Sequence, residues 1–285
     1  MLKNMSVGPL TTNYHLREAY RRVNDRVVQA LHRAGRRPDD AILVAVTTDA
    51  TPDQIRMLVD MGHLDLGETE VQHLGQRVAQ LSEFLHRRHQ LAGAAPKHTP
   101  VVMAGRSPGE SSSTDSVRWH MVGMVQRTKV RHVVPVVRLI HSIDSLRLAE
   151  ELHSFLARQS ARSDSKNLPT VAILVQVNAT GDSAIRGVLA PAVRHVCEQI
   201  DTMVHLRLRG LMAQTPPDCD DEATRTIFSR TADIFREIRE MKVAGREFNI
   251  LSMGNSNNFE PAIEHGANIV RVGRALFKPE EIERV

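Results

Sequence analysis

Two short segments near the C-terminal end combine small residues and arginines in a pattern that suits anion binding. They are SMGNSNN (252–258) and RVGR (271–274). The first leads into a predicted helix, whose backbone N–H groups and positive dipole end would face a phosphate. In the second, Gly273 lets the backbone approach a ligand closely, and a guanidinium lies on either side of it. The alternative is that Ser256 and Asn257 only cap the helix, and the spacing leaves both interpretations open.

Acid–base candidates follow other predicted strands. Asp49, Glu68 and His120 could do acid–base work on a phosphorylated small molecule at the mouth of the fold. His141 is more simply explained as the end of a strand, with Ser142 or Asp144 capping the next helix. The fourteen histidines show no metal-ligand spacing, and neither cysteine follows a recognisable strand end. We therefore predict no metal site and no cysteine nucleophile.

The elements that must position these groups alternate between strands and helices. Eight strand-like segments are expected at 41–48, 64–68, 119–123, 137–143, 172–178, 206–212, 248–254 and 268–273. The expected helices cover 13–35, 52–61, 70–86, 125–134, 145–158, 189–201, 222–240 and 258–265. This alternation predicts an α/β protein with a (β/α)8 TIM barrel, in which ligands bind at the carboxyl ends of the strands. An open doubly wound sheet is disfavoured, because TTDATP after the first strand has no glycine for a phosphate loop.

The domain organisation follows from the same pattern. We expect a flexible N-terminus over residues 1–12, then one barrel domain over 13–285 that begins with a long helix. A segment rich in Gly, Pro and Ser interrupts the pattern at about 87–116 and is expected to be a mobile insertion. A second polar loop is expected at 160–167.

Composition and charge exclude several classes of protein. The net charge is +4, but the basic residues are dispersed among 33 acidic ones, and one Trp and two Tyr are too few for a base-stacking platform. No nucleic-acid partner is therefore expected. No apolar stretch approaches about 18 residues, so no membrane span is predicted. Two cysteines without metal-ligand spacing, and no secretory signal, fit a cytoplasmic protein.

Seven segments of the chain, taken in order, carry a family resemblance. They are VAVTTDATPDQI, LGETEVQ, WHMVGMVQRTKV, IHSIDSLRLAEEL, VQVNATGD, LRLRGLM and LSMGNSNNFEPAIEHGANIVRVGRALF. Their order and spacing resemble the pyridoxal-phosphate homeostasis protein family, single-domain relatives of the alanine racemase N-terminal barrel, over roughly residues 13–278. The resemblance implies that pyridoxal 5′-phosphate binds at the barrel mouth.

The resemblance also implies roles for individual residues. Arg271 would face the pyridine nitrogen, Ser256 would hold the phosphate, and the backbone at Gly273 and Arg274 would complete the phosphate site. The remaining members of the predicted cofactor-binding set are Thr48, Asn178, Ser252 and Asn255.

The chain departs from the family pattern at the residue that would bond to the cofactor. The family's lysine ends the first strand in a pattern like AV[ST]K, whereas this sequence reads AVTT and places Thr48 there. Other changes put Thr69, Asn255 and Lys278 at family motif positions. A hydroxyl cannot replace a primary amine in that chemistry. We therefore predict a non-catalytic homeostasis or carrier protein that binds pyridoxal 5′-phosphate non-covalently.

Two other functions stay open at this stage. One is a paralogue that has lost the cofactor and acts through protein partners. The other is an enzyme with a rewired pocket that acts on a phosphorylated small molecule.

Overall fold

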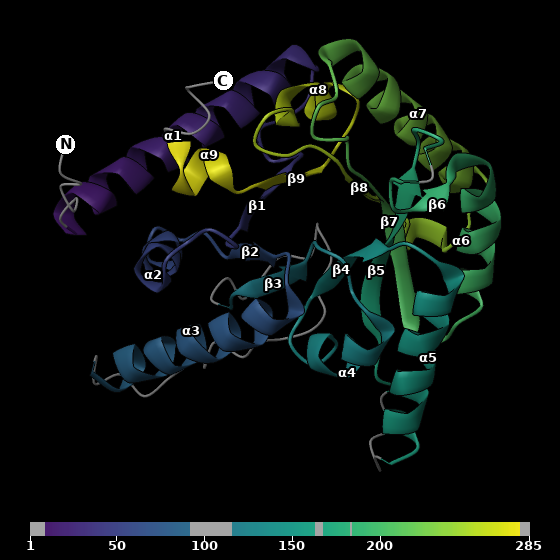
Figure 1. Cartoon of the computed structure of the whole chain (residues 1–285), viewed down its shortest axis with the longest axis horizontal. Helices are drawn as coiled ribbons and strands as arrows, with labels where there is room; N and C mark the ends of the chain where they lie inside the picture. The colour runs from purple at the N-terminus through teal and green to yellow at the C-terminus, as the bar shows by residue number, and fades with distance from the viewer. Residues whose placement is uncertain (1–8, 92–115, 163–167, 183, 280–285) are drawn as a thin grey trace.

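The computed structural model describes residues 9–91, 116–162, 168–182 and 184–279, and its strands form a closed parallel barrel (Figure 1). The barrel wall consists of β1 (Ile42–Val46), β2 (Asp65–Glu68), β3 (Arg118–Met121), β4 (Leu139–Ile143), β5 (Val171–Asn178), β7 (Leu206–Ala213), β8 (Ile250–Ser252) and β9 (Ile269–Val272). Each strand pairs in parallel with its neighbour, and the β1–β9 and β4–β5 pairings close the sheet. The predicted α/β class and (β/α)8 barrel are confirmed.

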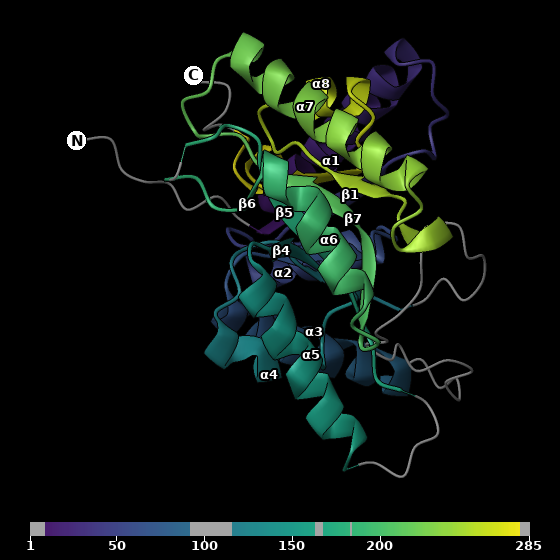
Figure 2. The ribbon, with the colours of Figure 1, turned by 90° about the vertical axis from the view of Figure 1, so that its right-hand side faces the viewer.

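Helices cover the outside of the barrel (Figures 1 and 2). They are α1 (Pro9–Arg33), α2 (Pro52–Asp60), α3 (Val71–Leu91), α4 (Val130–Val133), α5 (Leu146–Ser160), α6 (Val193–Asp201), α7 (Asp221–Glu240), α8 (Phe259–Glu264) and α9 (Arg274–Phe277). The long helix α1 packs on α8 and α9, where the Arg26 guanidinium lies 4.7 Å above the Phe259 ring and donates to Glu260 at 2.7 Å. No helix among the described residues is long and apolar enough to span a bilayer.

The core has two parts because successive strand residues point to opposite faces of the wall. The larger part lies between the barrel and its helices. The smaller part fills the barrel interior with Val44, Val122, Leu139, Leu174, Met212, Ile250 and Ile269. Gly67 also faces this interior, where a Cβ atom would lie 2.8 Å from Cγ1 of Val44. Strands such as β1 (ILVAV) therefore read as continuous apolar runs, as strands buried on both faces do.

The structure differs from the predicted elements at several boundaries. Helix α1 begins at Pro9 instead of residue 13, since proline suits the first turn of a helix, so residues 9–12 are helical. Helix α3 continues to Leu91, so 87–91 belong to a helix and not to the insertion. The rest of the predicted insertion (92–115), residues 1–8 of the predicted N-terminus and residues 163–167 of the second loop lie outside the described residues.

Two segments predicted as helices contain a short strand or a 3₁₀ turn as well. The start of the 189–201 segment is β6 (Val188–Leu189), which pairs with β5, followed by the 3₁₀ turn η2 (Ala190–Ala192). The 125–134 segment contains the 3₁₀ turn η1 (Arg127–Lys129) before the short α4. A further 3₁₀ turn, η3 (Gly245–Glu247), precedes β8.

Candidate functional site

The two segments predicted to bind phosphate lie side by side at the carboxyl ends of β8 and β9. Ser256 is buried, and its hydroxyl oxygen accepts hydrogen bonds from the backbone N–H groups of Gly273 (3.1 Å) and Ala275 (3.2 Å). Since the oxygen accepts both bonds, the hydroxyl hydrogen stays available to donate to a ligand. The hydroxyl of Ser256 thus contacts the start of α9, and the predicted cap of α8 is not its role in this structure.

The neighbouring positions shape this phosphate-site candidate. A Cβ atom at residue 273 would lie 3.1 Å from the carbonyl oxygen of Val46, so glycine lets the end of β9 approach β1 closely. Asn255 is exposed, and its backbone N–H donates to Oδ1 of Asn258 at 2.8 Å, which holds the loop in shape. The side chain of Arg274 is exposed at the rim. Asn255 therefore organises the loop, and Arg274 contributes charge at its edge.

Arg271 is enclosed at the same end of the barrel. Only 5% of the residue is exposed, and its Nη1 donates to Oγ of Ser252 at 2.7 Å while Nη2 donates to the carbonyl of Ala213 at 2.9 Å. Within the described residues the guanidinium makes no other hydrogen bond, so three of its five N–H groups are left for a ligand. Burial lowers the pKa of Arg271 to about 10, which leaves it charged at neutral pH. Arg271 is therefore a fixed cation that can only donate.

Thr48 lies in a network of polar side chains at the end of β1. Its hydroxyl donates to Oε1 of Glu68 at 2.8 Å and lies 2.7 Å from the hydroxyl of Thr69. Glu68 is fully buried, and its Oε2 lies 2.9 Å from Nε of Arg77 on α3. Arg77 also donates to the carbonyl of Thr48 at 3.0 Å. The end of β1 thus carries, at position 48, a hydroxyl bonded to a carboxylate.

The acid–base candidates do not gather at an open mouth. Glu68 is buried against Arg77, and His120, only 2% exposed, lies inside the barrel next to Asp65. Asp49 is exposed and forms an ion pair with Lys278. Glu68, the last residue of β2, lies at the carboxyl end of the barrel beside Thr48, but its side chain and that of His120 are buried in polar networks and do not form an open acid–base site.

Asn178 is buried and organises the loop that follows β5. Its amide nitrogen donates to the carbonyls of Asp182 (2.7 Å) and Ile185 (2.8 Å), while its amide oxygen accepts from the hydroxyl of Thr180 at 2.7 Å. The side chain therefore stabilises the loop at the mouth, and its hydrogen-bonding groups are used within that loop.

Sequence reasoning also missed the contacts of His141. Its Nδ1 lies 2.9 Å from Oγ of Ser252, so it reaches the group that supports Arg271. The N-cap of α5 is Ser145, which makes no side-chain cap hydrogen bond, and not Ser142 or Asp144 as predicted. No signal in the spacing could have revealed the His141–Ser252 contact, because 111 residues separate the two in the chain.

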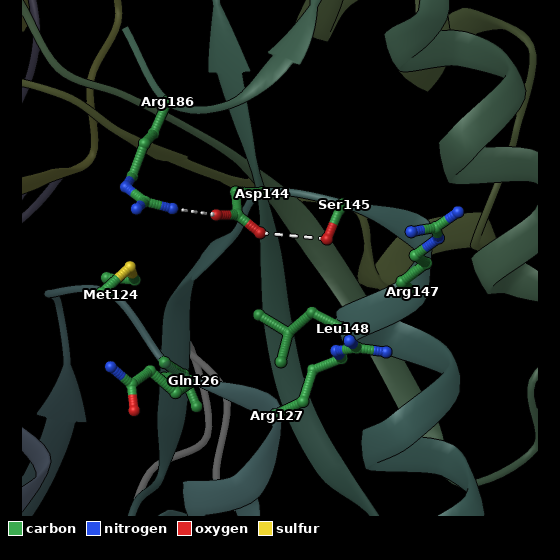
Figure 3. Close-up of a pocket in the computed structure, with 9 residues that line it drawn as sticks. Met124, Gln126, Arg127, Asp144, Ser145, Arg147, Leu148 and Arg186 are labelled. Atoms are coloured by element: carbon green, nitrogen blue, oxygen red, sulfur yellow. Dashed lines mark hydrogen bonds and ion pairs between the residues drawn. The ribbon is translucent and has the colours of Figure 1, made fainter. Parts of the chain in front are cut away.

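A pocket of about 420 Å³ opens on the other side of the mouth, where β3, β4 and β5 end (Figure 3). It is lined by Met124, Val125, Gln126, Arg127, Asp144, Ser145, Arg147, Leu148 and Arg186. In Figure 3, Arg186 reaches Asp144, and the two form an ion pair of 3.4 Å. Three guanidinium groups against one carboxylate make this side of the mouth positive. Arg127, Arg147 and Arg186 are separated by 20 and 39 residues in the sequence, so no local pattern pointed to this pocket.

Comparison with known proteins agrees with the barrel and with the strand-end segments. Residues 114–281 match the sequence model of the alanine racemase N-terminal domain. A pyridoxal phosphate homeostasis protein of Mycobacterium leprae is 31% identical over 274 residues, which cover 94% of this chain and 93% of the relative. A second such protein, from Aquifex aeolicus, is 28% identical over 264 residues, covering 91% of this chain and 96% of that protein.

Solved structures show the same fold. An unknown protein from Bifidobacterium adolescentis has a TM-score of 0.77 and 27% identity, covering 96% of this chain and 98% of that one. PipY of Synechococcus elongatus, solved with pyridoxal phosphate bound, has a TM-score of 0.66 and 24% identity, covering 88% of this chain and 99% of its own. With its barrel and its matched segments, this chain belongs to the pyridoxal phosphate homeostasis protein family, whose barrel is that of the alanine racemase N-terminal domain.

Proposed function

We propose that this chain binds pyridoxal 5′-phosphate reversibly at the mouth of the barrel and acts as a non-catalytic carrier in the homeostasis of that cofactor. One observation carries the proposal: Arg271 and Ser256 are both held in place by hydrogen bonds, while position 48 offers only a hydroxyl. The relatives that bear the homeostasis name, and the PipY structure with pyridoxal phosphate, support the choice of ligand.

The residues present fit both ends of this ligand. At the phosphate end, the Ser256 hydroxyl has a hydrogen to donate, and the backbone at Gly273 allows close approach. At the ring end, the buried Arg271 guanidinium offers donors that suit an unprotonated pyridine nitrogen. When bound, pyridoxal 5′-phosphate supplies an aldehyde and an electron-accepting ring, and a guanidinium at its nitrogen weakens that acceptor. This environment suits storage better than catalysis.

The bond to the protein is non-covalent because Thr48 cannot supply an amine. A hydroxyl does not form the carbon–nitrogen bond that a lysine makes with an aldehyde. The Thr48 hydroxyl is moreover bonded to Glu68, which holds it away from other roles. The protein therefore holds its small phosphorylated ligand by charge and hydrogen bonds, and releases it on dilution.

We place this function in the cytoplasm. Both cysteines, Cys197 and Cys219, are free thiols, and burial raises the pKa of Cys197 to about 12, so it behaves as an unreactive core residue. Free thiols fit a reducing compartment.

The test is an absorption titration of the purified protein with pyridoxal 5′-phosphate, before and after dialysis and borohydride treatment. We expect a saturable spectral change that dialysis reverses, and no lysine-bound cofactor by mass spectrometry after reduction. A reduced adduct on a lysine would overturn the non-covalent part. If the spectrum does not change, the proposed ligand is wrong, and the interpretation as a paralogue acting through protein partners takes its place.

A further inference from the structure

A chain of buried polar side chains crosses the apolar interior of the barrel. It starts at Asp65 on β2, where Oδ1 lies 3.2 Å from Nε2 of His120 on β3. Nδ1 of His120 then lies 2.9 Å from Nε2 of His141 on β4, and Nδ1 of His141 lies 2.9 Å from Oγ of Ser252 on β8. Ser252 accepts from Arg271 on β9 at 2.7 Å. The chain thus joins five of the eight wall strands.

The members of this chain are shielded from water. His141 and Ser252 are 0% exposed, His120 is 2% exposed, and Asp65 is 8% exposed. The surrounding interior consists of aliphatic side chains such as Leu139. Buried polar groups are costly unless each one has a partner, so the direction of every hydrogen bond in the chain is constrained.

The two ends of the chain fix that direction. At one end, burial raises the pKa of the Asp65 carboxyl, but hydrogen bonds from Arg118 and His120 outweigh burial and hold the pKa well below its usual range. Asp65 is therefore a carboxylate that can only accept. At the other end, Arg271 can only donate. Ser252 must accept from Arg271, and its hydroxyl hydrogen then points to Nδ1 of His141.

The two histidines complete the chain as neutral rings. With Nδ1 of His141 accepting from Ser252, Nε2–H of His141 donates to Nδ1 of His120, and Nε2–H of His120 donates to Asp65. Burial also lowers the pKa of His141 well below its ordinary value. The reverse order would need a second proton on His120, which would add another buried cation beside a carboxylate that Arg118 already neutralises. The order that satisfies every group runs one way, from Arg271 to Asp65.

We propose that His141, His120 and Asp65 are positioning residues for Arg271, acting through Ser252 in a one-directional hydrogen-bond chain. The chain holds the guanidinium in one orientation at the ring end of the ligand site, and this use of Arg271 rests on the proposed function. It also ties the mouth to the Asp65–Arg118 ion pair at the amino ends of β2 and β3. A change in the Asp65–Arg118 ion pair therefore alters the orientation of the Arg271 guanidinium.

The first test uses the protein without ligand, so it does not depend on the proposed function. Nitrogen-15 NMR of the histidine side chains should show His120 and His141 as neutral rings with the proton on Nε2. The Nη signals of Arg271 should be distinct in the wild type, and they should merge in His141→Leu because the guanidinium can then rotate. A doubly protonated His120, or Nη signals that do not change in His141→Leu, would overturn the proposal.

The second test compares two ligands that share the phosphate site. In His141→Leu, affinity for pyridoxal 5′-phosphate should fall by about tenfold, while affinity for inorganic phosphate should stay near that of the wild type. His141→Gln, whose amide can both accept and donate, should recover most of the loss. Arg209→Met removes a buried arginine outside the chain and controls for general destabilisation. Equal loss of both ligands in His141→Leu would show a merely structural role and overturn the proposal.

The outcomes separate this inference from the proposed function. If the wild type binds no pyridoxal 5′-phosphate, the proposed function fails, and the NMR test still decides whether the chain positions Arg271. If the wild type binds the cofactor and the Nη signals fail to respond, only the inference is wrong.

Discussion

Lys278 holds its ammonium group 3.2 Å from the carboxylate of Asp49, the residue that follows Thr48 in the chain. This ion pair places an amine next to the end of β1, where the family resemblance expects a lysine. Lys278 is therefore the first lysine to examine whenever the cofactor is reduced onto the protein.

Replacing Thr48 with lysine should create covalent attachment of pyridoxal 5′-phosphate. The new amine would lie beside Arg77, whose like charge lowers the pKa of a lysine, and beside Glu68, whose carboxylate raises it. Borohydride reduction followed by peptide mass spectrometry should locate the cofactor at residue 48. The matched control is Thr128→Lys, which adds an amine at an exposed position near the mouth and should give no such adduct.

Two results would contradict this prediction. A cofactor found on Lys278 in the wild-type protein would show that a lysine outside β1 already attaches it. If the Thr48→Lys protein does not bind the cofactor although circular dichroism shows an intact fold, the predicted site does not bind pyridoxal 5′-phosphate.

Changes at Ser256 should act on phosphate binding. Ser256→Ala removes the acceptor for two backbone N–H groups and a donor to the ligand, so affinity for phosphate esters should fall by about tenfold. Ser256→Glu places a negative charge at the same point and should abolish binding. Isothermal titration calorimetry with pyridoxal 5′-phosphate measures both. Asn257→Ala, one residue away and exposed, is the control, and an equal effect there would mean that the loop as a whole matters and not this hydroxyl.

Glu68 should matter for stability more than an ordinary acidic residue. Glu68→Gln leaves the Arg77 guanidinium, whose side chain is 14% exposed, without its charge partner. Loss of one member of a buried ion pair typically costs about 3 kcal/mol in the free energy of unfolding. Urea denaturation should show this loss, whereas Glu198→Gln, in the exposed pair with Arg194, should cost below about 0.5 kcal/mol. Comparable losses in the two variants would contradict the buried role of Glu68.

Asp65 should make the protein acid-sensitive. Its pKa is held below the usual range in the folded state, so the unfolded chain takes up the proton first as the pH falls. The stability from this group is present above about pH 4, the ordinary pKa of Asp, and declines below it. Between pH 5 and pH 3, the wild type should lose about 1 kcal/mol more of its free energy of unfolding than Asp65→Asn does. Parallel losses in urea denaturation at the two pH values would contradict this.

Sequence reasoning reached the barrel because its signals are local. AILVAVTT reads as a strand buried on both faces, and the apolar periodicity of the helices is continuous. The Ser256–Gly273 contact was also accessible, since both residues follow strands that end at the same edge of a parallel barrel. Boundaries such as the start of α1 at Pro9 depend on end effects that periodicity does not describe.

The buried polar networks could not be predicted from the sequence, for a physical reason. Whether Glu68 points to the mouth or to Arg77 depends on the facing of a single strand residue, and a shift by one position reverses it. His120 and His141 looked like isolated histidines, because their partners Asp65 and Ser252 lie 55 and 111 residues away in the sequence. The Asp65–His120 contact became visible only when β2 and β3 were in register.

The interior polar chain affects which strand register the barrel adopts during folding. A one-residue slip of β3 would bring Trp119 or Met121 into the interior and turn His120 towards the helices. Asp65 would then lose the hydrogen bond from His120, and His141 would lose its partner at Nε2, and both losses in an aliphatic core cost free energy. The same hydrogen bonds that orient Arg271 therefore raise the free energy of barrels with misaligned strands, and the polar interior favours the native register.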